Sequence, residues 1–225
     1  MTTYFITGAN RGLGLEFARQ LSKRAETTII GTAREPEKAT ELARLVHDVV
    51  PLDVGDPASL GALAERVKDR PIDVLINNAG VSSTAKSVSE LELGELQRVF
   101  AVNAFGPLLV ARALLPNLRA GKGKTVFNIT SMLGSIGKNT GGSSYPYRGS
   151  KAALNMLTVC MANELEAEGF TCVVVHPGWV QTDMGGPSAP LTVEQSVAAM
   201  LKVLDGLKPG ETGKFFNYDG KGLEW

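Results

Sequence analysis

The stretch "TYFITGANRGLG", residues 3–14, decides the fold of this chain. Residues 3–8 are a short β-rich run, and over residues 11–24 apolar side chains recur at helical spacing. A strand therefore runs into a helix through a turn that holds three glycines, Gly8, Gly12 and Gly14. Glycines permit unusual backbone angles and close approach to the main chain, and the free N–H groups of a helix N-terminus attract phosphate. The turn predicts an α/β sheet with a dinucleotide cradle at its edge; the alternative is a merely tight turn.

The same alternation of short β-rich runs and longer amphipathic segments continues along the chain. Strands are expected at residues 3–8, 27–33, within 44–54, and at 72–80, 124–131, 170–178 and 213–218. Helices are expected at residues 11–24, from Pro36, from Asp56, at 89–118 with a kink at Pro107, at 146–168, and from Thr192 to about Gly206. Strand–helix alternation with right-handed crossovers predicts a single doubly wound α/β domain over residues 1–225. Its seven-stranded, mostly parallel sheet should have helices on both faces.

Capping residues mark where several of these helices begin. Asp56 is a typical N-cap, and the proline after it suits the first helical turn. Ser89 with Glu92, and Thr192 with Gln195, have the spacing of a capping box. These pairs predict two further helix starts.

The composition excludes several functional classes. Lys and Arg total 23, as do Asp and Glu, so the formal net charge is zero and a basic nucleic-acid-binding surface is not expected. The two cysteines, Cys160 and Cys172, are too few and too scattered for a disulfide framework. No basic N-terminal segment precedes an apolar run, and no apolar segment approaches the roughly 20 residues that span a bilayer. These features predict a cytoplasmic protein that binds neither nucleic acid nor a membrane.

The residues that follow the second predicted strand, beside the glycine turn, bear on the choice of cofactor. Domains that prefer NAD place an acidic residue about 20 residues after the glycines. The same count from Gly14 reaches Arg34, and Arg11 lies inside the turn itself. Two guanidinium groups suit a 2′-phosphate, so NADP(H) is predicted over NAD(H). The prediction fails if Glu35 turns inward instead, or if both arginines are ordinary solvated side chains.

The segment "YPYRGSK", residues 145–151, carries a candidate catalytic pair. Residues four apart share one face of a helix, so Tyr147 lies beside Lys151, whereas Tyr145 lies beside Gly149. A free phenol has a pKa of about 10, and an adjacent ammonium lowers it toward the range useful for general acid–base catalysis. Tyr147 is therefore the tyrosine expected to transfer a proton, without the help of a metal. By itself the pair is a weak signal, because both residue types are common.

Further motifs stand at the predicted carboxyl ends of strands or inside the long helix. Ser131 ends "NITS", and Asn103 lies in "AVNAFGP". "NNAG" occupies residues 77–80, and "HPGWVQTDM" occupies residues 176–184. Together with TGxxxGxG and YxxxK, in this order, they resemble the short-chain dehydrogenase/reductase family from Thr7 to the last strand. The resemblance implies a Rossmann-type fold and a nicotinamide-dependent oxidoreductase.

The resemblance implies a catalytic tetrad of Asn103, Ser131, Tyr147 and Lys151. Tyr147 would protonate a ketone or aldehyde oxygen, while Lys151 would lower the pKa of Tyr147 and bind the nicotinamide ribose. Ser131 would polarise the carbonyl, and Asn103 would hold the helix kink and a water in a proton relay. The alternatives are local: Asn103 could satisfy backbone groups near Pro107, and Ser131 could be an ordinary loop hydroxyl.

The cofactor-binding residues are carried over in the same way. The resemblance places one group of residues at the phosphates and the adenosine: Gly8, Arg11, Gly12, Leu13, Gly14, Asp53, Val54, Asn78, Ala79 and Gly80. Arg34 joins this group from the count of 20 residues after Gly14. Those expected at the nicotinamide are Tyr147, Lys151, Pro177, Gly178, Val180 and Thr182. Asp53 could instead be only a turn former. His176 has no role in the family and is interpreted as structural or as part of the rim.

The short segment 182–192 and the sequence "SSYPYRGSK" are similar to the C-factor-like and sniffer-like carbonyl reductase branch of the family. So short a lid predicts an open pocket that discriminates poorly among small substrates. The expected function is NADPH-dependent reduction of a ketone, aldehyde or quinone carbonyl. The alternative is a cofactor-binding signalling or interaction protein with little turnover. The resemblance is also compatible with a homodimer or homotetramer built through residues 89–118 and 146–168.

Overall fold

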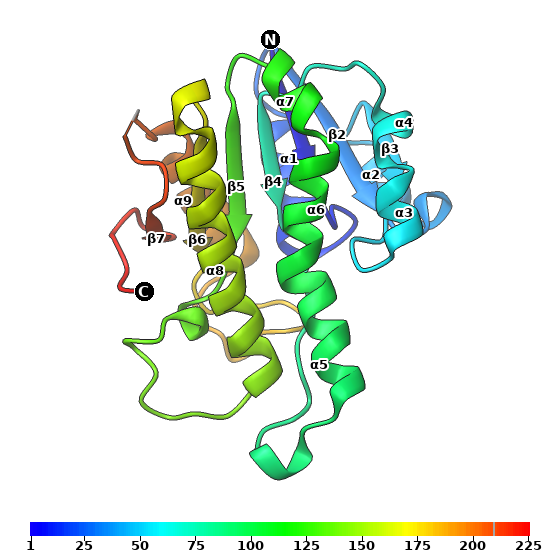
Figure 1. Cartoon of the computed structure of the whole chain (residues 1–225). Coiled ribbons are helices and arrows are strands. Elements are labelled where there is room, and N and C mark those ends of the chain that lie inside the picture. Colours follow the sequence, from blue (N-terminus) through cyan, green and yellow to red (C-terminus); the bar gives the residue numbers. More distant parts are fainter. Residues whose placement is uncertain (209) are drawn as a thin grey trace.

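The computed structural model describes residues 1–208 and 210–225, and its centre is one sheet of seven strands in the order β3-β2-β1-β4-β5-β6-β7 (Figure 1). The strands are β1 (Thr2–Ile6), β2 (Thr27–Ala33), β3 (Asp48–Pro51), β4 (Val74–Asn77), β5 (Thr125–Ile129), β6 (Thr171–His176) and β7 (Phe215–Asn217). Every pairing between these strands is parallel. The doubly wound α/β fold is confirmed, and the sheet is parallel throughout.

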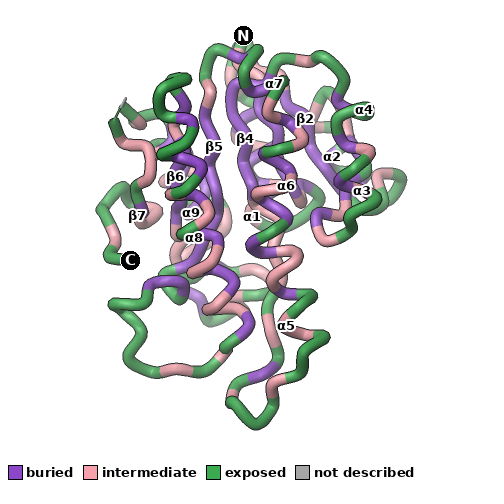
Figure 2. Tube along the Cα trace, viewed as in Figure 1, coloured by how far each residue is buried: buried purple, intermediate pink, exposed green. Residues whose placement is uncertain are grey.

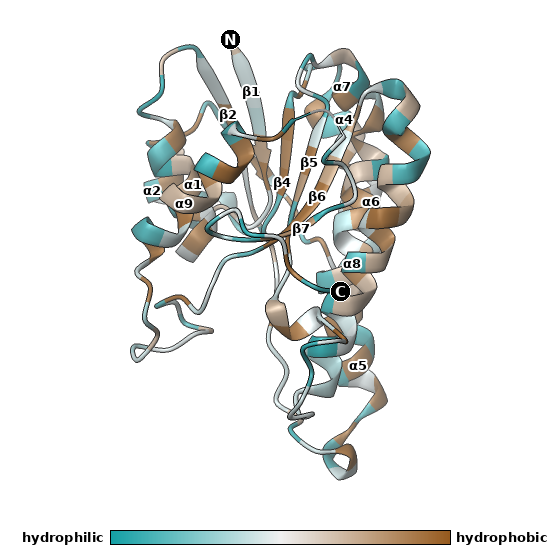
Figure 3. Ribbon diagram, turned by 90° about the vertical axis from the view of Figure 1, so that its left-hand side faces the viewer, coloured by the Kyte–Doolittle hydropathy of each residue, from teal (hydrophilic) through white to brown (hydrophobic). Residues whose placement is uncertain are grey.

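Helices cover both faces of the sheet, as the side view shows (Figure 3). One face carries α1 (Gly12–Leu21), α2 (Thr40–Ala43) and α9 (Val193–Asp205); the other carries α3 (Pro57–Gly61), α4 (Leu63–Val67), α6 (Gly106–Ala113), α7 (Leu115–Ala120) and α8 (Tyr145–Leu165). Strand side chains alternate between the two cores. In β1, Tyr4 and Ile6 enter the core under α1 and α9, whereas Phe5 enters the core under α6 and α8. Burial on both faces explains the nearly continuous apolar runs of the inner strands.

Exposed loops gather at the carboxyl edge of the buried strands, which is the lower edge in Figures 1 and 2. The chain runs outward from β1 through β2 to β3 and then returns to β4 beside β1, so the strand order reverses between β1 and β4. Ligands of doubly wound sheets bind at such a reversal. α5 (Leu93–Phe100) projects beyond this edge (Figure 1). Among the described residues, no helix has the length and apolar character needed to cross a membrane.

The expected single helix at residues 89–118 is wrong. α5 is followed by a π-helical stretch, Ala101–Phe105, and then by α6 and α7. Pro107 has no N–H to donate to the carbonyl four residues earlier, so a regular α-helix cannot continue through it. Gly106 is needed as well, because a Cβ there would lie 2.7 Å from the carbonyl oxygen of Val54. Gly106, at the start of α6, therefore lets α6 approach the loop after β3 closely.

The capping box expected at Ser89 and Glu92 is also wrong. Ser89 lies inside a short 3-10 helix, Val88–Glu90, and Glu92 precedes α5 without a side-chain cap. The preceding loop is held by Glu95 instead, whose carboxylate accepts the hydroxyl of Thr84 at 2.9 Å. A carboxylate in the first turn of α5 therefore orders the loop in place of the expected cap.

The capping box expected at Thr192 and the N-cap expected at Asp56 agree with the structure. The hydroxyl of Thr192 accepts the N–H of Gln195 at 3.2 Å, and the Gln195 side chain accepts the N–H of Thr192 at 3.0 Å. Asp56 caps α3. The helix expected from Pro36 is only a 3-10 turn, Pro36–Lys38, followed by the four residues of α2. The helix expected from Asp56 is divided into α3 and α4.

Candidate active site

The turn between β1 and α1 is shaped by its glycines. Gly8 and Gly12 have φ angles of 61° and 53°, in the left-handed region that favours glycine. A Cβ on Gly14 would lie 2.2 Å from the carbonyl oxygen of Gly8, so a side chain there would block the turn. α1 begins after Arg11 with no side-chain cap on its first N–H groups, while Leu13 packs against the core below. The uncapped N–H groups and the open turn fit the pyrophosphate of a dinucleotide.

The loop after β4 is tied to this turn by hydrogen bonds. The hydroxyl of Thr7 accepts the N–H groups of Asn78 and Ala79 at 3.0 and 3.1 Å. The side chain of Asn78 donates to the carbonyl oxygens of Thr7 and Gly8 at 3.0 and 3.1 Å. Thr7 and Asn78 therefore fix the two loops against each other at the reversal of strand order.

A pocket of about 340 Å³ lies where β2 and β3 end. Arg34, Asp53 and Arg66 are among the residues that line it. Asp53 also accepts the N–H of Gly55 at 2.9 Å and so shapes the turn, and Val54 beside it is buried. The pocket thus offers guanidinium groups and a carboxylate where the sequence predicts the adenosine. Arg66 was missed, because on a short helix nothing distinguishes it from a surface arginine.

Arg11 and Glu35 occupy the rim of this corner. Glu35 forms an exposed ion pair with Lys38, which lowers the pKa of the carboxyl group, and Glu35 does not line the pocket. Arg11 forms an exposed ion pair with Asp183, with Nη1 2.6 Å from Oδ2. The ion pair between Arg11 and Asp183 joins the glycine turn to the loop after β6. Arg11 can therefore bind a phosphate either by leaving Asp183 or through the guanidinium N–H groups that this ion pair does not use.

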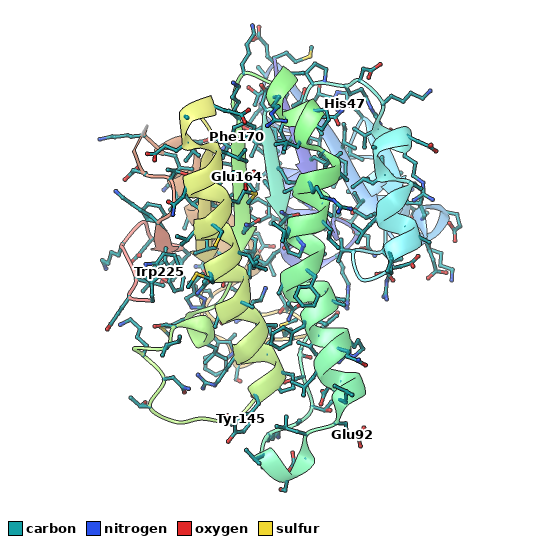
Figure 4. The ribbon with its side chains drawn as sticks, viewed as in Figure 1. His47, Glu92, Tyr145, Glu164, Phe170 and Trp225 are labelled. Atoms are coloured by element: carbon teal, nitrogen blue, oxygen red, sulfur yellow. The ribbon has the colours of Figure 1, made fainter. Side chains whose placement is uncertain are left out.

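Tyr147 and Ser131 face each other at the carboxyl edge of the sheet. Ser131 precedes a 3-10 helix, Met132–Gly134, and accepts the N–H of Leu133 at 3.1 Å. Tyr147 lies in the first turn of α8, whose start is marked by Tyr145 at the lower end of the helix in Figure 4. Burial raises the pKa of Tyr147, and the facing Ser131 hydroxyl offsets part of the rise. The phenol therefore carries its proton at neutral pH.

Lys151 is buried one helical turn further along α8, with 4% of its surface exposed. Its Nζ donates to the carbonyl oxygen of Ile129 at 2.9 Å and lies 5.9 Å from the ring centroid of Tyr147. Burial lowers the pKa of Lys151 to about 8. The net pKa of Tyr147 stays above its ordinary value in this structure, because desolvation of the phenol dominates and the Lys151 ammonium donates its hydrogen bond to Ile129.

Asn103 joins the π-helical stretch to the loop after β4. Its Oδ1 accepts the N–H of Val81 at 2.8 Å, and its Nδ2 donates to the Val81 carbonyl at 2.9 Å and to the Ser150 hydroxyl at 3.1 Å. A Cβ on Gly80 would lie 3.4 Å from Asn103 Oδ1 and 3.8 Å from Lys151 Nζ. Asn103 therefore satisfies backbone groups at Val81, and its amide lies across Gly80 from the ammonium of Lys151.

The residues after β6 form the opposite side of the site. Pro177 accepts the hydroxyl of Ser196 from α9 at 2.6 Å. Gly178 has a φ of 84°, and a Cβ there would lie 2.4 Å from Cδ1 of Leu191. Glycine at this position therefore allows residues 177–178 and the segment before α9 to meet.

Val180 and Thr182 continue this side toward the glycine turn. Val180 is buried and forms an isolated β-bridge with Leu191. A Cβ on Gly12 would lie 3.8 Å from Cγ2 of Thr182, so Thr182 stands next to the turn. The structure thus places the predicted catalytic and cofactor-binding residues along one edge of the sheet, with Arg11 turned to Asp183.

Comparison with known proteins agrees with this arrangement. A model of the family described as short chain dehydrogenase matches residues 2–190. The chain belongs to this family. The C-signal protein of Myxococcus xanthus is 49% identical over 164 residues, which cover 73% of this chain and 99% of that protein.

Two solved carbonyl reductases are similar over the whole length of this short-chain dehydrogenase. The carbonyl reductase Sniffer of D. melanogaster has a TM-score of 0.92 and 34% identity, with 100% of both chains covered. The NADPH-bound carbonyl reductase from chicken fatty liver has a TM-score of 0.88 and 36% identity, with 100% of this chain and 99% of that one covered. The chain is an oxidoreductase of the carbonyl reductase type, in the sniffer-like and C-factor-like branch of the family.

A second pocket of this short-chain dehydrogenase, of about 330 Å³, lies next to the segment that begins at Ser131. Its walls include Met132, which directly follows Ser131, together with Trp179, Leu191 and Leu223. Of its lining residues, the sequence reasoning named only Gly178 as a site residue and interpreted His176 as structural or rim. The others come from segments far apart along the chain, and no local pattern brings them together. The short lid contributes Leu191 to the wall of this pocket.

Proposed function

We propose that this short-chain dehydrogenase is an NADPH-dependent reductase of ketone, aldehyde or quinone carbonyls, with Tyr147 as the general acid. The observation that carries the proposal is the convergence of Tyr147, Ser131 and Lys151 on the edge of the sheet that holds the glycine turn. Membership of the family and the two similar carbonyl reductases support the reaction class.

A nicotinamide dinucleotide, when bound, supplies the hydride for the carbonyl carbon. The protein's own groups handle the oxygen and the proton. The Ser131 hydroxyl orients the carbonyl oxygen, and Tyr147 donates its phenolic proton to that oxygen as the alcohol forms. The raised pKa of Tyr147 keeps this proton in place before the reaction. The ammonium of Lys151 then stabilises the phenolate that remains, because an opposite charge nearby favours the ionised form.

Preference for NADP(H) over NAD(H) is the second part of the proposal. Arg34 lines the pocket at the end of β2, while Glu35 pairs with Lys38 at the surface. A guanidinium group binds a phosphate through paired, charge-assisted hydrogen bonds, which the hydroxyl of NAD cannot replace. The similar chicken enzyme was solved with NADPH bound.

The test is NADPH oxidation in the presence of a panel of aldehydes, ketones and quinones. Tyr147→Phe should lower kcat at least about 100-fold, the usual contribution of a general acid, and change the Kd for NADPH far less than kcat. Tyr145→Phe is the matched control, because Tyr145 is exposed two residues away and should keep full activity. Equal turnover by Tyr147→Phe and the wild-type protein would refute the assigned mechanism.

A second candidate function is a nucleotide-bound signalling or interaction protein with little turnover. The observation that favours it is the similarity to the C-signal protein. This candidate predicts that NADP(H) raises the melting temperature while no compound of the panel is reduced. Turnover that depends on Tyr147 would reject it in its simple form.

Self-association through residues 89–118 and 146–168 stays a prediction. Phe105 and Met156, one from each segment, are exposed apolar side chains that such an interface would cover. Light scattering coupled to gel filtration measures the number of chains directly. Phe105→Glu should convert an assembly built on this face to a monomer.

A further inference from the structure

The pocket beside Ser131 contains a polar group that the proposed reaction leaves unused. His176 ends β6 and lines this pocket. Its Nδ1 is buried and has no hydrogen-bond partner among the described residues. Buried polar atoms in folded proteins are nearly always paired, so an unpaired ring nitrogen in a pocket wall bears on which tautomer the ring adopts.

The unpaired Nδ1 indicates which nitrogen of His176 carries the proton. A neutral imidazole has one N–H donor and one acceptor nitrogen. A buried N–H without a partner is rarer than an acceptor without one, so the proton belongs on Nε2. Burial lowers the pKa of His176 to about 4, which keeps the ring neutral at physiological pH. His176 therefore offers the pocket an uncharged N–H donor.

The other side chains that line this pocket are mostly apolar and favour an apolar ligand. Trp179, Leu191 and Leu223 line the pocket together with the thioether of Met132. The space depends on Gly178, where a Cβ would lie 2.4 Å from Leu191. Apolar walls with a few placed polar groups are typical of pockets for small organic molecules. An aryl or alkyl carbonyl compound suits these walls.

Two other polar side chains line the same pocket. The amide of Asn217 already donates to Asp219 at 2.7 Å. Tyr218 places a phenol in the wall and is a competing donor. A test of His176 therefore needs Tyr218→Phe beside it.

His176 and Ser131 stand at the ends of neighbouring strands. In the parallel pair β5–β6, Ile129 is opposite Val175, and the N–H of Thr130 donates to the Val175 carbonyl at 2.9 Å. Neighbouring strands lie about 4.8 Å apart. In this register His176 is level with Thr130, the residue before Ser131, and Met132, the residue after Ser131, lines the pocket together with His176. A ligand whose carbonyl oxygen is held by Ser131 can therefore direct a second oxygen, a few bonds away, toward His176.

We propose that His176 is a specificity-determining residue, whose Nε2–H donates a hydrogen bond to a second oxygen of the substrate. The preferred substrates are then apolar carbonyl compounds with another oxygen acceptor close to the reacting carbonyl, such as vicinal diketones. The inference rests on the proposed function, because Ser131 and Tyr147 define where the reacting carbonyl lies.

The test compares benzil with deoxybenzoin, which lacks one of the two carbonyl oxygens. For each variant, kcat/KM is measured for both compounds with NADPH, and the ratio is compared with the wild-type ratio, so that the intrinsic reactivity of the diketone cancels. His176→Phe should lower the ratio about three- to tenfold, which is the contribution of one neutral hydrogen bond, mainly through KM for benzil. His176→Gln keeps an N–H donor and should retain most of the ratio.

Several results would overturn the inference. A ratio unchanged in His176→Phe, or equal losses for both compounds, would mean that the imidazole does not recognise the second oxygen. A fall in the ratio in Tyr218→Phe alone would assign the hydrogen bond to the phenol. Circular dichroism and thermal melts establish that each variant folds; if His176→Phe does not, His176→Leu takes its place in the same comparison.

A binding measurement separates failure of this inference from failure of the proposed function. The chain has two tryptophans, and Trp225 lies beside β7 with its ring centroid 5.4 Å from that of Phe215 (Figure 4). In a Trp225→Phe background, quenching of Trp179 fluorescence reports ligand in the pocket. Benzil should bind three- to tenfold more weakly after His176→Phe, and deoxybenzoin equally well. Binding that depends on His176 without any turnover would reject the proposed reductase function and support the role of His176 in this pocket. Turnover that does not depend on His176 would support the reductase function and reject the role of His176.

Discussion

Replacing Lys151 with methionine is expected to stabilise the protein at neutral pH while abolishing carbonyl reduction. Lys151 is 4% exposed, and burial lowers its pKa from 10.5 to about 8. At pH 7 its charge is retained inside the protein at a cost in folding free energy. Methionine has a similar length and carries no charge, so it removes this cost together with the group that supports Tyr147.

The magnitude follows from the pKa shift. Each unit is worth about 1.4 kcal/mol, so the buried charge of Lys151 destabilises the folded state by about 3 kcal/mol. Methionine also removes the hydrogen bond to the Ile129 carbonyl, and this loss reduces the gain in the free energy of unfolding by about 1 kcal/mol. The expected net gain of about 2 kcal/mol raises the Tm of a chain of this size by roughly 4 to 8 °C.

The pH dependence gives the sharper measurement. Between about pH 8 and 10.5 the unfolded chain holds a proton on Lys151 that the folded chain has lost, so wild-type stability rises with pH through this window. The advantage of Lys151→Met should therefore be full at pH 7 and disappear near pH 10.5. Urea denaturation at both pH values measures it. Lys202→Met is the control, because Lys202 is exposed on α9 and should change stability by no more than about 0.5 kcal/mol at either pH.

Two outcomes would contradict this reasoning. Lys151→Met could be less stable than the wild-type protein at pH 7, which would mean that the ammonium is a net contributor to folding. Alternatively, the gain could persist undiminished at pH 10.5, and the buried charge would then not be its source.

Three further changes test other parts of the site. Gly14→Ala should destabilise the protein by about 2 kcal/mol and abolish NADPH binding, since its Cβ would lie 2.2 Å from the Gly8 carbonyl oxygen; urea melts and NADPH fluorescence measure both effects. Arg34→Leu should lower kcat/KM for NADPH about 10-fold or more and leave that for NADH nearly unchanged, and equal losses for both cofactors would refute the phosphate contact. The lowered pKa of His176 means that below pH 6.5 the unfolded chain binds a proton that the folded chain refuses until about pH 4. Wild-type stability should fall across this window by up to about 3 kcal/mol, and a smaller fall in His176→Gln would identify the residue.

The architecture followed from local patterns along the chain. The inner strands are buried on both faces and the longer helices on one, so the period of apolar residues identified the order of elements along the chain. The breaks around Pro107 did not follow so simply. Their extent depends on Gly106 approaching the Val54 carbonyl, a contact between segments that the chain does not place near each other in sequence. The failed cap at Ser89 has the same origin, because Glu95 orders that loop through Thr84.

Some parts of the candidate site could likewise be predicted from the sequence, and others could not. Tyr147 and Lys151 could be paired from the sequence because a helical turn has a constant length. The glycine turn could be interpreted because its residues are consecutive. The walls of the second pocket could not, since Met132, Leu191 and Leu223 come from three separate segments.

By itself, then, the sequence determined the order of strands and helices, the dinucleotide turn and the tyrosine–lysine pair. All of these depend on repeats and spacings within one or two elements. Only the tertiary structure decided which groups are desolvated and which strand ends adjoin. Burial, not spacing, holds the proton on Tyr147 and moves the pKa of Lys151 to about 8. The adjacency of β5 and β6 brings His176 to the pocket beside Ser131, because parallel strands from distant parts of the chain end at a common edge.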